Sequence, residues 1–107
     1  MSPGRDILFK ARTPLGFTVR VTRSQWTVIT TIKHPVMAGC EEEVRIVLEE
    51  PGEIRRSKND ANVYLFYRSR HTRRWVCAVT KHEDGSGFLI TAYPTDAIKE
   101  GERIWPK

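Results

Sequence analysis

Four strand-like segments fill the second half of the chain, and only short polar connections separate them. They run over residues 53–57, 62–68, 74–82 and 87–93. Connections this short permit hairpins between antiparallel strands, whereas a crossover between parallel strands needs about a dozen residues or more. The second half is therefore predicted to form an antiparallel β-meander, whose apolar face must be covered by helices or by another sheet.

The first half is predicted to supply a β-hairpin and a helix. Apolar and polar residues alternate over residues 7–22, on both sides of a Thr-Pro-Leu-Gly turn. Ser24 is the expected N-cap of a helix over residues 25–33, which Pro35 would end. The inner side of this helix is expected to carry Trp26, Ile29 and Ile32.

A second helix is predicted over about residues 37–50. Glu41–Glu43 lie in its N-terminal half, where the helix dipole favours acidic side chains, and Pro51 follows its end. Its inward stripe is expected to consist of Val44, Val47 and Leu48. These elements predict one α+β domain over residues 1–107: two helices packed on an antiparallel β-meander sheet over about residues 53–93, preceded by the N-terminal β-hairpin.

The chain is basic overall. Eighteen Lys and Arg residues against thirteen Asp and Glu residues give a net charge of +5 and a pI near 9.6. Five of the acidic residues lie on the second predicted helix, so the rest of the surface is more basic than the net charge implies. This balance favours an anionic partner, nucleic acid above all, although a basic surface can also serve solubility alone.

The sequence shows no membrane or export signal. No apolar run approaches the roughly 18 residues of a membrane span, and the first residues have neither the apolar core nor the cleavage site of a signal peptide. We therefore expect a cytoplasmic protein without a membrane partner, in which Cys40 and Cys77 are small buried apolar side chains. The Cys and His spacings match no zinc motif, and no cofactor is expected.

Arginine and lysine gather at the ends of the predicted strands. Arginine forks bind phosphate oxygens bidentately, and lysine supplies a point charge. Aromatic residues on the segment 62–68 could stack nucleic-acid bases, but burial in the core is the favoured interpretation because an alternating strand buries one face. The alternative for the arginines is a solvated hairpin tip. The candidate RNA-binding residues are Arg55, Arg56, Lys58, Arg68, Arg70 and Arg74.

Four separated residues are candidates for catalysis. His34 lies at the junction of the two predicted helices, where it could act as general base or acid, or only bond a free carbonyl at a helix end. Thr91 and Tyr93 share one face of the last predicted strand, and Lys81 lies on the neighbouring strand. A hydroxyl, a phenol and an ammonium could hold a phosphate and stabilise its developing charge. Thr91 could equally be an ordinary strand former.

The exit of the last predicted strand is expected to be structural. Pro94 should end the strand because it cannot continue the hydrogen-bond ladder. Asp96 is the expected N-cap of a helical turn over residues 95–100. The core side of the strand should carry Phe88, Ile90 and Ala92.

Element order and short phrases over residues 24–105 resemble the barnase–EndoU–colicin–RelE-like nuclease superfamily of small bacterial and phage proteins. The phrases are Lys33-His34-Pro35, the Glu-rich helix, residues 51–57, 64–68 and 88–96, Lys99-Glu100-Gly101 and Trp105. The resemblance implies a helix pair on an antiparallel sheet. It also implies a metal-independent ribonuclease, in which the 2′-hydroxyl attacks the adjacent phosphate to give a cyclic phosphate and a free 5′-hydroxyl.

The same resemblance implies roles for individual residues. His34 would be the base or acid, and Thr91 with Tyr93 would orient the phosphate. The residues that would neutralise it are Arg56, Arg68 and Lys81. We therefore expect an RNA-cleaving toxin of a toxin–antitoxin pair, covered by an acidic antitoxin. Two alternatives stay open: a nucleic-acid-binding module without chemistry, and a protein-interaction domain that pairs through the edge of its N-terminal hairpin.

Overall fold

The computed structural model describes residues 6–98 and 100–107. Seven strands form one sheet in the order β1-β2-β6-β5-β4-β3-β7, and neighbours are antiparallel except β2 and β6, which pair in parallel. The elements are β1 (Ile7–Arg12), β2 (Thr18–Thr22), α1 (Arg23–Val28), the π-helical segment η2 (Ile29–Lys33), the 3-10 turn η3 (Pro35–Met37), α2 (Glu41–Glu49), β3 (Glu53–Arg56), β4 (Val63–His71), β5 (Arg74–Glu83), β6 (Ser86–Thr95) and β7 (Glu102–Trp105). The predicted α+β class, with a leading hairpin and an antiparallel meander, is confirmed.

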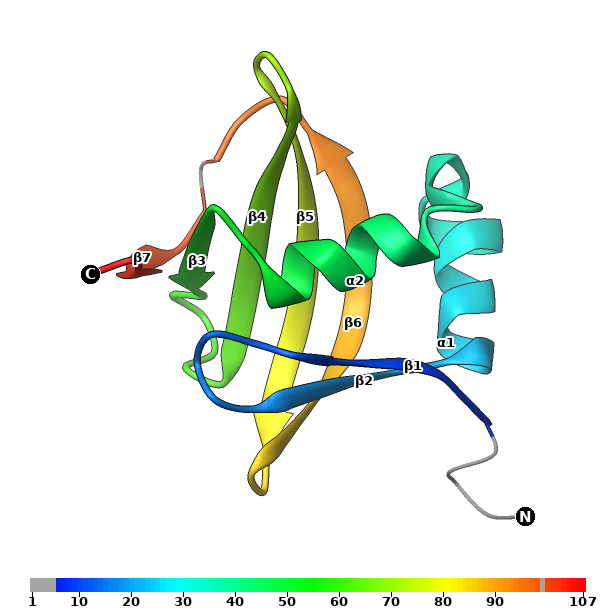
Figure 1. Ribbon diagram of the computed structural model, residues 1–107, viewed down its shortest axis with the longest axis horizontal. Coiled ribbons are helices and arrows are strands. Elements are labelled where there is room, and N and C mark those ends of the chain that lie inside the picture. Colours follow the sequence, from blue (N-terminus) through cyan, green and yellow to red (C-terminus); the bar gives the residue numbers. More distant parts are fainter. Residues whose placement is uncertain (1–5, 99) are drawn as a thin grey trace.

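One layer of helix and hairpin covers one face of the meander. Figure 1 shows α2 and the β1–β2 hairpin in front of β4, β5 and β6. The predicted stripe of α2 is fully buried there. Each such aliphatic side chain contributes about 1.5–3 kcal/mol relative to an exposed position. The core between the layers includes Val19, Val21, Val44, Val47, Leu48, Phe66, Val76, Ala78, Leu89 and Ala92. In the described part of the chain, no helix combines the length and apolar character needed to cross a membrane.

The first helix differs from the expectation in its cap and in its inner side. Thr22, not Ser24, caps α1, because its Oγ1 accepts a hydrogen bond from the backbone N–H of Gln25 at 3.1 Å. Ile29 is buried as expected, but Ile32 is 75% exposed. The reason is that the helix widens to a π-helix after Val28, which adds a residue to the turn and rotates the following side chains away from the core.

The second helix begins at Glu41, four residues later than predicted. Pro35 starts a 3-10 turn instead, and Gly39 then adopts a φ of +82° that no helix contains. The three acidic residues Glu41–Glu43 therefore form the first turn of α2, where its dipole favours them.

The exit of β6 also differs. Pro94 lies within β6, opposite Val76, because the outer edge of β6 is bound to β2 only through Gly87 and Phe88, and an edge position tolerates the missing N–H. Of the helical turn predicted over residues 95–100, residue 99 lies outside the described residues and the others are not helical. Asp96 is not an N-cap.

The segment after β6 crosses the sheet to reach β7, a strand that the sequence analysis missed. Figure 1 shows this connection running from the end of β6 to β7 beside β3, at the opposite edge. Ile98 packs against the buried residues Leu65, Tyr67 and Cys77. The register of β3 to β6 places these three side chains opposite the α2-covered layer, on a surface that we call the back face. The back face carries Glu53, Arg55, Leu65, Tyr67, Cys77, Val79, Lys81, Thr91 and Tyr93.

Candidate functional site

A row of polar side chains crosses the back face from strand to strand. Glu53 pairs with Tyr67, Tyr67 with Cys77, and Cys77 with Tyr93. The imidazole of His34 continues the row beyond the edge of the sheet, with its ring centroid 5.3 Å from that of Tyr93. The fold thus brings two predicted catalytic residues from distant parts of the chain into contact.

A β-bulge in β6 decides which side chains reach this face. Val79 pairs with Thr91, but the next residue of β5, Thr80, pairs with Leu89, so Ile90 is an extra residue in β6. Leu89 therefore turns into the core, whereas Thr91 and Tyr93 point to the back face. The expectation that Phe88 and Ile90 are core residues is wrong, because both are only half-buried; the burial of Ala92 is confirmed.

The π-helical segment η2 positions His34. The backbone N–H of His34 donates to the carbonyl of Ile29 at 2.7 Å, which closes the wide turn. The ammonium of Lys33 reaches the carbonyl of Ile90 at 3.5 Å and so links η2 to the outer edge of β6. Neither link uses the imidazole of His34, which therefore stays available at the end of the row.

The hydroxyl of Thr91 is a polar group without a partner. Its Oγ1 is buried and has no hydrogen bond among the described residues. A buried hydroxyl left unpaired is destabilising by about 1–3 kcal/mol. The hydroxyl of Thr91 can therefore gain a hydrogen bond only from a partner outside the described residues, such as a ligand or water.

Replacing Thr91 with valine is expected to raise the free energy of unfolding by about 1 kcal/mol, since the change removes the unpaired hydroxyl and keeps the shape. Urea unfolding at neutral pH measures the difference. Thr80→Val is the control, because Thr80 is a buried threonine of the neighbouring strand whose Oγ1 donates to the carbonyl of Tyr64 at 3.5 Å. Equal effects of the two substitutions would show that the unpaired state of Thr91 has no energetic consequence.

Lys81 lies on the back face but does not approach His34. Its ammonium is 3.3 Å from Oδ2 of Asp60, in the turn between β3 and β4. The pKa of Asp60 is lowered by a backbone hydrogen bond from Asn62 and by Lys81. Of the four predicted catalytic residues, His34 and Tyr93 are thus in contact, Thr91 shares their face, and Lys81 points to another part of it.

Burial keeps the phenols and the thiol of the row protonated. It raises the pKa of Tyr93 and of Tyr67 far above the ordinary value, with Cys77 as a further cause in each case. Burial likewise raises the pKa of Cys77 to about 12. At neutral pH Cys77 is therefore a thiol rather than a nucleophilic thiolate, and Tyr93 is a neutral hydrogen-bond donor.

Tyr67 and Cys77 belong to the row, although the sequence analysis assigned them only to the core. Their burial was predicted correctly. Their alignment with Tyr93 follows from the strand register, which the alternation of side chains alone does not fix. In the residues that the structure describes, no group of three or more His, Cys, Asp and Glu side chains is placed to hold a metal ion.

The predicted RNA-binding cations are not brought to one surface, and most of them are bound within the chain. Arg55 pairs with Glu53 at 2.6 Å, Arg68 donates to the carbonyl of Glu50, and Lys58 lines a separate cavity near Gly101. Arg56 is exposed at the end of β3. The strand order sends these side chains to different faces and ends of the sheet, so they do not surround His34 and Tyr93.

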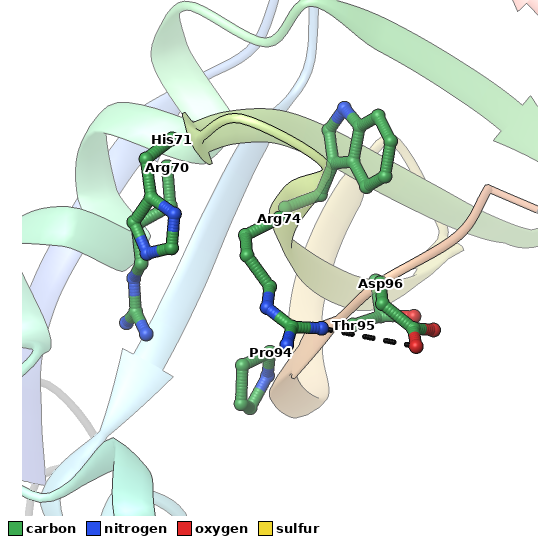
Figure 2. Close-up of a pocket in the computed structure, with 7 residues that line it drawn as sticks. Arg70, His71, Arg74, Pro94, Thr95 and Asp96 are labelled. Atoms are coloured by element: carbon green, nitrogen blue, oxygen red, sulfur yellow. Dashed lines mark ion pairs between the residues drawn. The ribbon is translucent and has the colours of Figure 1, made fainter.

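Arg70 and Arg74 meet at one cleft beside the β4–β5 hairpin (Figure 2). The cleft has a volume of about 480 Å³. Its lining residues are Arg70, His71, Arg74, Trp75, Pro94, Thr95 and Asp96. Two of the predicted RNA-binding residues thus line one cavity.

No family model, curated protein or solved structure matches this chain. Its function must therefore be inferred from the arrangement of its own residues.

Proposed function

We propose that this protein is a ribonuclease that cleaves RNA without a metal ion, through attack of a 2′-hydroxyl on the adjacent phosphate. The products are a 2′,3′-cyclic phosphate and a free 5′-hydroxyl. The observation that carries the proposal is the contact of His34 with Tyr93, at 5.3 Å between ring centroids, on the same face of β6 as the unpaired hydroxyl of Thr91. An imidazole, a protonated phenol and a free hydroxyl are groups that can move protons and hold a phosphate.

The proposed reaction uses His34 and Tyr93 as a pair. His34 takes the proton of the 2′-hydroxyl while the 2′-oxygen forms its bond to phosphorus. The bond between phosphorus and the 5′-oxygen breaks, and the leaving oxygen takes a proton from Tyr93, whose phenol is protonated at neutral pH. The imidazolium then returns its proton to the phenolate, so the pair is reset without a net change.

Thr91 and the cations of the back face stabilise the phosphate in this scheme. Because its Oγ1 is buried, the hydroxyl of Thr91 donates to a non-bridging phosphate oxygen only after the side chains that cover it move apart, and the phosphate then supplies the partner that it lacks in the free protein. Lys81 and Arg55 lie on the same face and neutralise the RNA backbone further from the reacting phosphate. Both cations are held by carboxylates, so they attract RNA weakly in comparison with free cations.

The test is incubation of the purified protein with tRNA and mRNA in EDTA, followed by analysis of the fragment ends. Fragments with 2′,3′-cyclic phosphate and 5′-hydroxyl ends are expected. Cleavage that EDTA abolishes would overturn the metal-independent reaction. RNA that stays intact but is bound with a strong salt dependence would replace the proposal with a nucleic-acid-binding module.

We further propose that the ribonuclease is the cytoplasmic toxin of a toxin–antitoxin pair, and that an acidic antitoxin covers His34. Val28, Ile32 and Val36 are the exposed large apolar residues among the described ones, and they lie at intervals of four residues around His34. Residues 23–40 contain no acidic side chain. An acidic amphipathic helix fits this surface, since its apolar face would cover the three residues and its carboxylates would meet Lys33 and Arg23.

Ile32→Glu is expected to abolish binding of the proposed acidic antitoxin, sought as the product of a gene adjacent to that of this chain, because the new charge meets an apolar and acidic partner. Thr31→Glu is the control, because Thr31 is the exposed residue directly before Ile32 in η2. Titration of the two purified proteins measures the difference. The antitoxin proposal fails if the adjacent product binds neither the unmodified chain nor the control.

A further inference from the structure

The cleft at the β4–β5 hairpin presents two guanidinium groups to a common space. Figure 2 shows the side chains of Arg70 and His71 on one side and Arg74 on the other, with Asp96 beyond Arg74. The hairpin segment 68–74 contains four arginines and one histidine but no acidic residue. The volume of the cleft, about 480 Å³, lies within the range of small-ligand sites, roughly 300–1,000 Å³.

Arg70 is fixed in position by α2. Its Nε donates to Glu43 Oε2 at 2.9 Å, and its Nη2 donates to Glu43 Oε1 at 2.6 Å. The bidentate pair holds the guanidinium plane, while Nη1 has no hydrogen-bond partner among the described residues. Arg70 can therefore offer a preorganised donor to an anion in the cleft without releasing Glu43.

Arg74 is held loosely. Its Nη1 lies 3.7 Å from Asp96 Oδ2, and the two side chains are 56% and 72% exposed. A charge-assisted hydrogen bond is about 2.7–2.9 Å long, and an exposed ion pair contributes at most about 1 kcal/mol. A phosphate, which can take both arms of the guanidinium fork, can replace this carboxylate at little cost.

The cleft and the proposed catalytic pair lie at the same end of β6, and Trp75 and Thr95 of the cleft share the back face with Tyr93. Pro94 lines the cleft, and the preceding residue, Tyr93, contacts His34 on the back face. Neighbouring residues of a strand are about 3.3 Å apart along its axis. An RNA chain that passes around the exit of β6 can thus place one phosphate at His34 and Tyr93 and a neighbouring phosphate in the cleft.

We propose that this cleft is a subsite for the phosphate of a nucleotide that flanks the cleaved bond, with Arg74 as its switching ligand and Arg70 as its fixed ligand. The position next to the cleaved bond rests on the proposed ribonuclease function, whereas the binding of phosphate in the cleft does not. The chemistry is that of a phosphate monoester or diester, and its source is a single-stranded RNA rather than a free nucleotide.

Calorimetric titration with 5′-AMP and with a cleavage-resistant 2′-O-methyl trinucleotide tests the site. Arg74→Gln is expected to weaken trinucleotide binding about tenfold, because one charged hydrogen-bonding group is lost. Asp96→Asn is expected to strengthen it several-fold, since the competing carboxylate is removed. Arg73→Gln is the matched control: Arg73 is the adjacent arginine of the same hairpin, is exposed, and does not line the cleft.

The outcomes separate the possibilities. Equal losses for Arg73→Gln and Arg74→Gln would reduce the effect to general attraction by a basic hairpin and overturn the subsite. AMP that binds as tightly as the trinucleotide would identify a free mononucleotide as the ligand and overturn the flanking assignment. An unchanged affinity in Asp96→Asn would show that Arg74 does not exchange its partner, and would also overturn the proposal.

Cleavage kinetics distinguish failure of the subsite from failure of the ribonuclease function. The loss of kcat/KM in Arg74→Gln is expected to be about tenfold for a tetranucleotide and smaller for a dinucleotide, which is too short to reach the cleft from His34. If RNA is cleaved with equal losses at both lengths, the subsite fails and the nuclease stands. If no RNA is cleaved but trinucleotide binding depends on Arg74 and Asp96, the phosphate site stands and the nuclease fails.

Discussion

Replacing His34 with alanine is expected to lower kcat for RNA cleavage by about 10²–10⁴-fold, the usual contribution of a positioned general acid or base. The fold should survive, because His34 contributes its backbone N–H to the η2 turn and alanine retains that group. Initial rates on a fluorescent oligoribonucleotide measure kcat, and thermal unfolding of the same sample checks the fold.

Two further variants make this prediction specific. His82→Gln is the control, since His82 stacks on Phe17 at 4.4 Å on the other side of the sheet and should affect stability more than kcat. Tyr93→Phe removes only the phenolic oxygen and is expected to lower kcat while leaving the ring against His34. Full activity in both His34→Ala and Tyr93→Phe would exclude the proposed pair.

The parts of the fold that depend on local patterns could be predicted from the sequence. Alternating side chains and short polar turns located all four meander strands, because these signals arise within each segment. The buried stripe of α2 follows from helical periodicity in the same way. The early start predicted for α2 failed at Gly39, where one positive φ outweighs the helical pattern on both sides.

The parts that depend on tertiary contacts could not be predicted in this way. The bulge at Ile90 appears only when β5 and β6 pair, and it exchanges the faces of Leu89 and its neighbours. The π-helical turn after Val28 likewise depends on docking of η2 against β6. The short segment β7 gains its partners only from β3.

The candidate site, like the fold, could be predicted from the sequence only where it depends on local patterns. The sequence placed Thr91 and Tyr93 on one face, which the structure confirms. It could not place His34 beside Tyr93, since that contact depends on η2, nor could it give Lys81 its partner Asp60. The ion pairs of the arginines depend on which acidic residues lie nearby in space, so a count of charges overestimates the cationic surface available to RNA.

The chain is expected to lose stability steeply above about pH 9, because of the buried row on the back face. Burial raises the pKa of Cys77 from an ordinary value near 9 to about 12. Below pH 9 both folded and unfolded chains carry the thiol proton, so this group does not affect stability. Between these two values only the unfolded chain loses the proton, which favours unfolding by about 1.4 kcal/mol for each pH unit.

The tyrosines of the row extend the loss at higher pH. Burial also raises the pKa of Tyr67 and Tyr93 above their ordinary value of 10, so they contribute with the same sign as the pH approaches and passes 10. Between pH 9 and 10 Cys77 is expected to contribute about 1 kcal/mol, and the two tyrosines together add somewhat less, so the Cys77 variant is needed to separate the two contributions.

Urea unfolding at pH 7, 9 and 10 measures this effect, and two cysteine variants assign it. Cys77→Ala is expected to be less stable at every pH but to lose about 1 kcal/mol less than the unmodified chain between pH 9 and 10. Cys40→Ala is the matched control, because Cys40 is only half-buried and lies outside the row. The change in stability with pH, rather than its absolute value, carries the comparison, so the small cavity left in Cys77→Ala does not affect the conclusion. A slope that Cys77→Ala leaves unaltered would mean that the thiol ionises as readily in the folded chain as in the unfolded one, and burial of the row would then not raise the pKa of Cys77.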